Sequence, residues 1–285
     1  MRFAHLGVGR PRLAIVHEGE AEYVDELIPD APRDLQELIE RGPGYLAELR
    51  AAAAAGTVER HPVHDLRHHS AVLRPPSIMA IGANYAAHSS ELALKVEKAA
   101  TVFSLWPNSL TGHDHTTSWP NELSTQVDYE AELGVIIGTA AKNVTEQDAL
   151  DHVFGYTVVN DITARDLQFS EAQWSRCKSF DGFTPTGPVV VTADEIPDPQ
   201  DLWLTTNLDG RIMQDASTAD MVRSVAQIVS YLSRSATLQP GTLISTGSPG
   251  GAGYSRTPPV FLRDGATVTV SIGGIGFLTT HCRVL

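Results

Sequence analysis

The sequence predicts an α+β fold, with a small N-terminal module at residues 1–74 and a larger domain at residues 75–285. Two observations favour this class. Predicted strands outnumber predicted helices, and they do not alternate with helices as they would in a parallel α/β sheet. The predicted secondary structure also changes near Pro75, where short apolar runs and helices are followed by longer strand-like segments.

Composition is that of an ordinary globular protein. The chain has 285 residues, of which 42% are apolar and 19% charged, enough for one large domain with or without a small one. No apolar run approaches the roughly 20 residues of a membrane span, and Met1–His5 lacks the apolar core of a signal peptide. Two isolated cysteines, Cys177 and Cys282, suit a reducing compartment. We therefore expect a cytoplasmic protein.

The net charge of −13 argues against nucleic acid or an anionic membrane as a partner, because both require a basic face. The expected partner is a small molecule. An anionic substrate would have to rely on local arginine and lysine residues or on a bound metal.

The N-terminal module reads as a small sheet followed by two helices. The first helix is expected to open at Asp30-Ala31-Pro32 and to stop at Gly42, with proline just inside the start and glycine just past the end. The second helix is alanine-rich and ends at Gly56. The three predicted strands and the second helix are Met1–His5, Leu13–His17, Ala21–Val24 and Tyr45–Ala55.

Histidines gather in the segment that follows, where His64 and His68 have the i,i+4 spacing of zinc ligands on a helix. No third ligand with matching spacing stands nearby, and Pro62 interrupts the pattern, so a connector is favoured over a zinc site. His113 and His115, which flank Asp114, are interpreted in the same way.

The strand Ile78–Ile81 leads into a segment of helical composition that carries His88 and Glu91, i,i+3 neighbours on one helix face. Spacing alone leaves two interpretations open. The helix could lie on the surface with Glu91 paired to Lys95. Alternatively, Glu91 could orient the imidazole of His88, which would then take a proton from water.

The segment that organises the chain is Val127–Gly138, where three acidic residues, Asp128, Glu130 and Glu132, precede a buried strand. On a strand they point the same way, with neighbouring carboxylates roughly 6.5–7 Å apart. Acidic residues are depleted in strands. The face is therefore either solvated or set against a hard cation such as Mg²⁺, Mn²⁺ or Ca²⁺.

The rest of the chain is predicted to be mostly strands. A buried strand ends at Asp161, and a later strand runs into the glycine-rich loop Gly247–Gly253, which lacks a phosphate-binding signature. The remaining predictions are a helix near Glu146–Leu150, a turn or short helix at Ile162–Gln168, a hairpin at Leu202–Asp215 turning at Asp209-Gly210, a helix at Ser224–Ser233, and closing strands Thr267–Ile272 and Ile275–Arg283.

Five motifs, in register over Pro75–Leu285, make this chain similar to the fumarylacetoacetate hydrolase family. They are Gly82-x-Asn84-Tyr85-x-x-His88-x-x-Glu91, Asp128-Tyr129-Glu130-x-Glu132-Leu133, Gly155-Tyr156-x-x-x-Asn160-Asp161-x-x-x-Arg165-Asp166-x-Gln168, Lys178-Ser179-Phe180-Asp181-x-Phe183-x-Pro185-x-Gly187-Pro188 and Thr246-Gly247-Ser248-Pro249. The stretch Arg256–Leu262 resembles the branch of diketo sugar-acid hydrolases and proteins labelled ureidoglycolate lyase.

The resemblance implies a mixed β-roll catalytic domain, commonly in a homodimer, with a Mg²⁺ or Mn²⁺ site. By motif, the metal ligands are Glu130, Glu132 and Asp161, with Asp128 beside them rather than among them. His88 and Glu91 match the water-activating dyad, and Lys178 a catalytic position. The implied substrate contacts are Tyr85, Arg165, Gln168, Thr246, Gly247 and Ser248.

The activity that the resemblance implies first is metal-dependent hydrolysis of a C–C bond in a β-diketo acid resembling an acylpyruvate. The keto-acid end would chelate the cation, and His88 would activate water. The alternatives are a 2-keto acid decarboxylase, an isomerase, hydratase or lyase on the same scaffold, and a catalytically silent member. Retention of all five metal and dyad residues argues against the silent member.

Trp106 is where the chain departs most from the pattern, because relatives commonly carry lysine in this place. An indole offers area and one N–H donor but no charge. We expect Trp106 to contact an apolar end of the substrate. The alternative is that it only packs in the core.

Overall fold

The computed structural model describes residues 1–56, 58–91 and 99–285, and its fold is α+β, as predicted. The helices are α1 (Val24–Leu27), α2 (Leu35–Arg41), α3 (Pro43–Ala54), α4 (Ala86–Glu91), α5 (Arg165–Ser170) and α6 (Val225–Ser235). The strands are β1 (Arg2–Leu6), β2 (Arg12–His17), β3 (Glu20–Tyr23), β4 (His61–Pro62), β5 (Ile78–Gly82), β6 (Thr101–Ser104), β7 (Leu110–Thr111), β8 (His115–Trp119), β9 (Val127–Asp128), β10 (Ala131–Ile137), β11 (Val153–Asn160), β12 (Thr163–Ala164), β13 (Thr184–Thr192), β14 (Trp203–Leu208), β15 (Arg211–Ser217), β16 (Leu243–Ser245), β17 (Thr267–Ile272) and β18 (Gly276–Val284).

The largest sheet runs in the order β4-β3-β2-β1-β13-β11-β10-β16-β5-β6. Its centre, β10, is buried at every residue, and it pairs antiparallel with β11 on one side and β16 on the other. Segments far apart in the sequence therefore meet around β10, which carries one of the acidic side chains.

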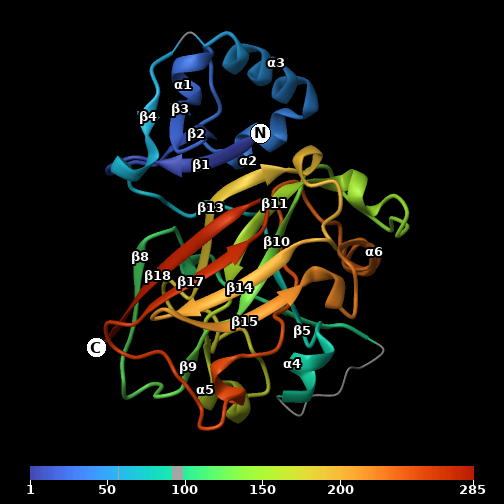
Figure 1. Cartoon of the computed structure of the whole chain (residues 1–285). Coiled ribbons are helices and arrows are strands. Elements are labelled where there is room, and N and C mark those ends of the chain that lie inside the picture. Colours follow the sequence, from blue (N-terminus) through green and yellow to red (C-terminus); the bar gives the residue numbers. More distant parts are fainter. Residues whose placement is uncertain (57, 92–98) are drawn as a thin grey trace.

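A second sheet, in the order β15-β14-β17-β18-β8, lies across the first (Figure 1). Alternate residues of β14 and β17 are buried, as expected for a sheet with one face on a core. That core holds Leu133 and Val135 of the first sheet together with Leu204, Val270 and Ile272 of the second.

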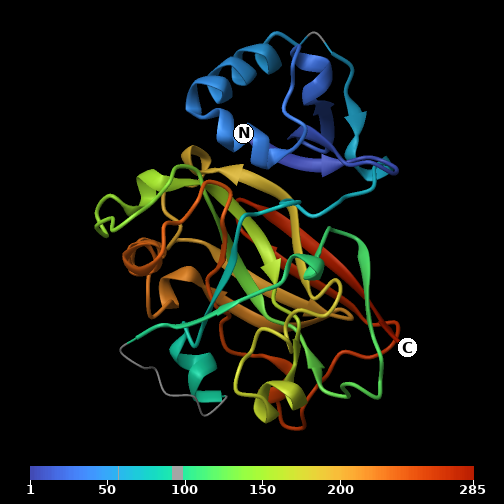
Figure 2. The same ribbon diagram turned by 180° about the vertical axis from the view of Figure 1, so that it is seen from behind.

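The N-terminal segment forms a lobe above the rest of the chain (Figures 1 and 2). Hydrogen bonds nevertheless join it to the main sheet, because β1 pairs with β13 at Phe3↔Val190. The two parts also share a core, in which Leu35 and Leu38 of α2 belong to the same buried cluster as Leu243. The lobe thus extends the main sheet, and a domain boundary at 74/75 stays a prediction.

Several predicted elements are confirmed by the structure. The hairpin β14–β15 turns at Asp209-Gly210, both at positive φ, and α6 begins after Ser224, which makes a capping box with Gln227. The closing strands β17 and β18 are also confirmed.

Three predicted elements are wrong in detail. Helix α2 begins only after Asp34, whose side chain accepts from the N–H of Glu37, so the cap lies four residues beyond Asp30. Asp30 itself has φ of 54°, a turn conformation. A 3₁₀ turn at Ala149–His152 replaces the helix near Glu146–Leu150, and Val24, predicted as strand, begins α1.

No helix of the described residues is long and apolar enough to cross a membrane.

Candidate metal centre

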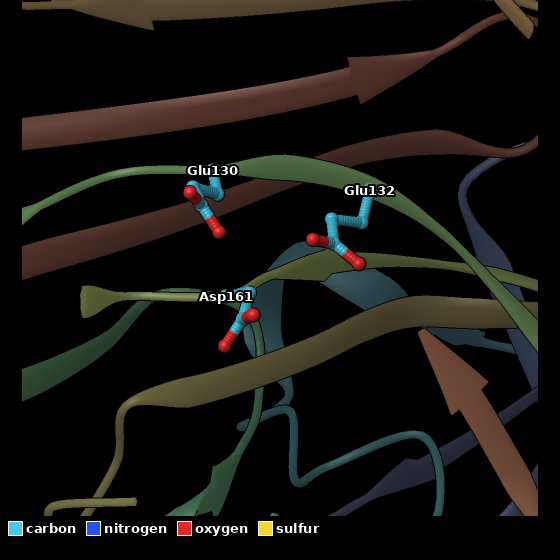
Figure 3. A group of neighbouring side chains, drawn as sticks. All are labelled: Glu130, Glu132 and Asp161. Carbon is cyan, nitrogen blue, oxygen red and sulfur yellow. The ribbon is translucent and has the colours of Figure 1, made fainter. Parts of the chain in front are cut away.

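The pairing of β10 with β11 brings three carboxylates together from segments about thirty residues apart. Ala131 lies opposite Asn160, so the residues flanking this pair, Glu130 and Asp161, become neighbours, and the N–H of Asp161 donates to the carbonyl of Glu130 at 2.9 Å. Glu132 follows on the same side of the strand. Figure 3 shows the carboxylates of Glu130 and Glu132 directed toward Asp161.

The three carboxylates have the arrangement of a cation site. One oxygen from each of Glu130, Glu132 and Asp161 lies within 4.8 Å of the others, and all three side chains are buried. The solvated-face interpretation of this segment is therefore wrong.

Asp128 stands apart from the three, contrary to the prediction that it would share their face. The strand is interrupted between β9 and β10, and the Asp128 carboxylate turns to accept from the N–H groups of Gly253 and Tyr254 at 2.8 and 2.9 Å. It also accepts from Nε of Arg165 at 3.2 Å. Asp128 thus holds the guanidinium of Arg165, which also binds the candidate metal ligand Glu130.

Two buried cations neutralise part of the site. Lys178 Nζ donates to Glu130 Oε2 and Asp161 Oδ2, both at 2.6 Å, and to Thr163 Oγ1 at 2.8 Å. Arg165 donates to Glu130 Oε1 at 2.7 Å and to Gln168 Oε1 at 2.9 Å. Both side chains are at most 2% exposed, so neither is screened by water.

These contacts separate the pKa values of the three carboxyl groups. Burial alone would raise the pKa of Glu130, but Arg165 and Lys178 hold it well below the usual range. Burial, with the nearby charges of Asp161 and Glu130, raises the pKa of Glu132 well above its usual range. Burial likewise raises the pKa of Asp161 to about 6, against the opposing effect of Lys178.

The residues present fit a divalent cation. Asp161 Oδ1 is buried and has no hydrogen-bond partner among the described residues, although such groups are rarely left unpaired. In the described cluster, four buried carboxyl groups (Asp128, Glu130, Glu132 and Asp161) lie beside two buried cations (Arg165 and Lys178). With all four ionised and His88 neutral, the excess would be two negative charges, which one Mg²⁺ or Mn²⁺ would balance; without an ion, burial favours the protonated form of Glu132.

His88 and Glu91 meet near the site but are not hydrogen-bonded to each other. His88 Nδ1 lies 3.9 Å from Glu91 Oε2, beyond hydrogen-bond range, and has no hydrogen-bond partner in the part of the chain that the structure describes. His88 Nε2 lies 3.1 Å from Glu130 Oε1. The surface-helix interpretation is wrong for His88, which is 4% exposed, and Lys95 lies outside the described residues.

The glycine-rich loop binds carboxylates of the protein itself. The N–H of Gly247 donates to Glu132 Oε2 at 2.8 Å, and that of Gly251 donates to Glu91 at 2.9 and 3.0 Å. The N–H of Gly253 donates to the Asp128 carboxylate in the same way. Gly247 has φ of +97°, and a Cβ there would lie 2.7 Å from Asn84, so this position requires glycine.

A small pocket opens onto the carboxylates. It is lined by Ile81, Gly82, Ala83, His88, Phe103, Glu130, Glu132, Asp161, Gln168, Trp174, Lys178 and Ser248. The space left among these side chains is about 10 Å³, close to the volume of one water-sized sphere.

The predicted substrate contacts divide into two sets. Gln168 and Ser248 line the pocket. The other four do not line the pocket; they are Arg165, Tyr85, Thr246 and Gly247. The Thr246 hydroxyl, for example, donates to the carbonyl of Leu133 at 2.8 Å. Burial raises the pKa of Tyr85.

Trp106 is 43% exposed and does not line the pocket. The alternative that it packs in the core is therefore wrong, and nothing in its position supports a substrate contact.

Three functional residues escaped the sequence analysis. Phe103 and Trp174 form part of the pocket wall. Gln214 of β15 donates from Nε2 to Ser248 Oγ and to the carbonyl of Pro249, both at 2.8 Å, and accepts from the N–H of Ala131. Phe103 lies three residues before Trp106, in the stretch that departs from the family pattern, but no local pattern marked Trp174 or Gln214.

The histidine-rich connector offers no second centre. His64 lies in a 3₁₀ turn rather than on a helix, so its spacing to His68 does not place both on one face. Among residues 1–56, 58–91 and 99–285, no other group of three histidine, cysteine or acidic residues comes close enough to hold an ion. The segment consists of a two-residue strand and a 3₁₀ turn with irregular chain around them, as expected of a connector.

Comparison with known proteins identifies one family. Residues 77–283 match the family model described as the fumarylacetoacetate (FAA) hydrolase C-terminal domain. A protein of Burkholderia ambifaria, named as a hydrolase without a substrate, is 40% identical over 282 residues, which is 97% of this chain and 95% of the relative.

Two solved structures extend the likeness over the whole fold. A fumarylacetoacetate hydrolase from Exiguobacterium antarcticum superposes with a TM-score of 0.88 and 36% identity, covering all of both chains. A maleylpyruvate hydrolase from Sphingobium sp. SYK-6, solved with manganese(II) and pyruvate, has a TM-score of 0.83 and 28% identity. The match covers all of this chain and 99% of that one.

Proposed function

This chain belongs to the fumarylacetoacetate hydrolase family, and from that premise we propose that it hydrolyses a C–C bond in a β-diketo acid with the help of Mg²⁺ or Mn²⁺. The observation that carries the proposal is the buried group Glu130, Glu132 and Asp161, in which one oxygen of Asp161 has no hydrogen-bond partner among the described residues. The maleylpyruvate hydrolase solved with manganese and pyruvate supports both the metal and the keto-acid class.

The three carboxylates would hold the cation. When bound, a divalent cation supplies Lewis acidity to the carboxylate and keto oxygens of a 2-keto acid. Lys178 and Arg165 keep Glu130 ionised, so that this ligand is ready for a cation at neutral pH.

His88 is the proposed general base. Its Nδ1 atom is buried and makes no hydrogen bond with the described residues, so this nitrogen is available to take a proton from a water molecule. Glu91 lies 3.9 Å away, close enough to pair with the imidazolium after a small movement, and such contacts often shorten only in the substrate complex.

Lys178 is better assigned to the carboxylates than to an oxyanion. An ammonium group has three donors, and all three are used by Glu130, Asp161 and Thr163. Lys178 would reach a substrate oxygen only by giving up one of these partners. We propose that its main role is to position Glu130 and Asp161.

A second candidate is decarboxylation of a 2-keto acid at the same carboxylates. The observation that favours it is the 3.9 Å gap between His88 and Glu91, because decarboxylation requires no activated water. An isomerase that moves protons along the keto acid would use the same groups.

The two candidates separate in one assay. Protein stripped of metal by a chelator and reloaded with Mn²⁺ is offered acylpyruvates and oxaloacetate, and loss of diketone absorbance is followed beside CO₂ release. Hydrolysis predicts loss of absorbance with one pyruvate formed per substrate. Release of CO₂ alone, with acylpyruvates untouched, would favour the second candidate.

A further inference from the structure

The lining of the pocket combines two kinds of residue. The polar ones are the three carboxylates with His88, Gln168, Lys178 and Ser248, and the others are Ile81, Gly82, Ala83, Phe103 and Trp174. A substrate whose keto-acid end faces the carboxylates therefore meets an apolar wall with its remaining part.

The wall is built from two aromatic rings packed edge to face. The rings of Phe103 and Trp174 have centroids 5.4 Å apart and an interplanar angle of 69°, the edge-to-face geometry that aromatic pairs prefer. The indole lies against Gly82, where an added Cβ would come within 2.4 Å of Cζ3. The missing side chain at Gly82 thus leaves the space that the indole occupies beside β5.

Phe103 joins this wall to the charged side. It belongs to β6, opposite Ala80 of β5, and Lys178 Nζ lies 5.4 Å from its ring centroid. A group placed on the wall would consequently lie next to the carboxylates, within the length of a short acyl chain.

Neither cation of the described site is placed to bind a second carboxylate of the substrate. Every donor of Lys178 is used. Arg165 binds Asp128, Glu130 and Gln168 and is not among the residues that line the pocket. A negative charge set against Phe103 and Trp174 would be desolvated without a cation beside it, which is costly.

We propose that Phe103 and Trp174 form an acyl-binding wall that selects β-diketo acids with an uncharged, apolar or aromatic distal group over diacids. The inference rests on the proposed function for the keto-acid end and adds the chemistry of the far end. Trp174 is the specificity-determining residue, since its indole lines the pocket, packs edge-to-face on Phe103 and lies against Gly82. The space left in the pocket is small, so the proposal requires the indole to move away from Gly82 when an acyl group binds.

The test uses the Mn²⁺-loaded protein and two compounds, 2,4-dioxo-4-phenylbutanoate with a neutral end and fumarylpyruvate with a charged one. For each we measure kcat/KM and, by calorimetry, the dissociation constant. The variants are Trp174→Ala, Trp174→Lys and a matched control, Trp203→Ala. Trp203 is 56% exposed on β14, outside the pocket.

Wild type is expected to prefer the phenyl compound by at least about tenfold, the scale set by small apolar groups in a pocket. Trp174→Ala should reduce this ratio about tenfold, Trp174→Lys should move it toward the diacid, and Trp203→Ala should leave it unchanged. The ratio of kcat/KM for the two compounds is informative even if a smaller side chain at residue 174 widens the pocket, because a wider pocket admits both compounds more easily.

A wild-type preference for the diacid, or a ratio unchanged in both Trp174 variants, would overturn the inference. If the phenyl compound binds more tightly in a Trp174-dependent way but is not cleaved, the acyl wall stands and C–C hydrolysis is wrong. If neither compound binds, both proposals are wrong.

Discussion

Lys178 Nζ lies 2.6 Å from Oδ2 of Asp161, whereas Oδ1 of the same carboxylate has no hydrogen-bond partner among the described residues. The protein therefore neutralises one oxygen of Asp161 and leaves the other without a donor. Because Lys178 binds Glu130 at the same distance, a single ammonium compensates two of the three candidate ligands. The third, Glu132, accepts hydrogen bonds from the Ser245 hydroxyl and the N–H of Gly247 at 2.5 and 2.8 Å, and burial raises its pKa.

Removing that ammonium should make the protein depend on the metal for stability. In Lys178→Met the buried carboxylates lose their partner, and breaking a buried ion pair from one side costs about 3–5 kcal/mol. Added Mn²⁺ should recover part of this loss, so the rise in Tm on adding Mn²⁺ should be larger in Lys178→Met than in wild type. Differential scanning calorimetry with and without Mn²⁺ measures both quantities.

Lys142→Met is the matched control for that experiment, since Lys142 is exposed and binds only the carbonyl of Ser235. Its Tm and its response to Mn²⁺ should follow those of wild type. An equal or smaller Mn²⁺ response in Lys178→Met would mean that the lysine and the cation do not share the same carboxylates.

The carboxylates themselves should decide cation binding. Asp161→Asn and Glu132→Gln each remove one charged ligand of similar shape, so Mn²⁺ affinity measured by calorimetry should fall at least about tenfold, within the range seen when groups at a metal site are altered. Chelation should abolish wild-type turnover and Mn²⁺ or Mg²⁺ should restore it. Asp151→Asn, on the exposed surface, should bind Mn²⁺ like wild type. Full activity in thoroughly metal-free protein would contradict the assignment.

His88 and Glu91 should contribute unequally. His88→Ala should lower turnover by roughly 10²–10⁴, the usual value of general acid–base catalysis. Glu91→Gln should have a smaller effect. Its carboxylate mainly holds the glycine-rich loop through Gly251 and Ser255, and an amide oxygen can still accept from these donors. Calorimetric Mn²⁺ binding should survive both changes. If His88→Ala kept wild-type turnover, His88 would be excluded as the general base.

The sequence predicted the grouping of the three carboxylates better than it predicted the support around them. Alternation along a strand was enough to place Glu130 and Glu132 on one side, and the strand end placed Asp161. The same reasoning failed for Asp128, because the break between β9 and β10 arises from pairing with β12, a tertiary contact. Gln214 and Trp174 reach the site from distant segments, and local sequence patterns do not predict such tertiary contacts.

The stability of the N-terminal lobe should fall in mild acid because of His5. Burial lowers the pKa of His5 to about 4 from 6.5. Its Nε2 accepts from the N–H of Leu35 and its Nδ1 faces the carbonyl of Ser70, both at 3.1 Å, so a proton on Nε2 would oppose a donor. Between pH 6.5 and 4 the unfolded chain binds a proton that the folded chain does not, and stability therefore decreases as pH falls.

The expected loss across that window is roughly 3 kcal/mol from His5 alone, measured as the free energy of unfolding in urea at each pH. His5→Gln should flatten the profile. His64→Gln, at a side chain that is 82% exposed, should not. A profile for His5→Gln as steep as that of wild type would assign the acid sensitivity to another group, such as His68, whose pKa burial also lowers to about 4.

Trp106 should not control substrate choice, although the sequence suggested that it would. Its backbone is fixed by Ser179 and Ser109, but the indole is 43% exposed and lies outside the pocket lining. Trp106→Lys would therefore place its ammonium in water, where it is screened and gains little from a distant carboxylate. We expect the ratio of kcat/KM for 2,4-dioxo-4-phenylbutanoate and fumarylpyruvate to stay within about twofold of wild type. A shift of that ratio toward the diacid would mean that residue 106 reaches the substrate and that the wall at Phe103 and Trp174 does not act alone.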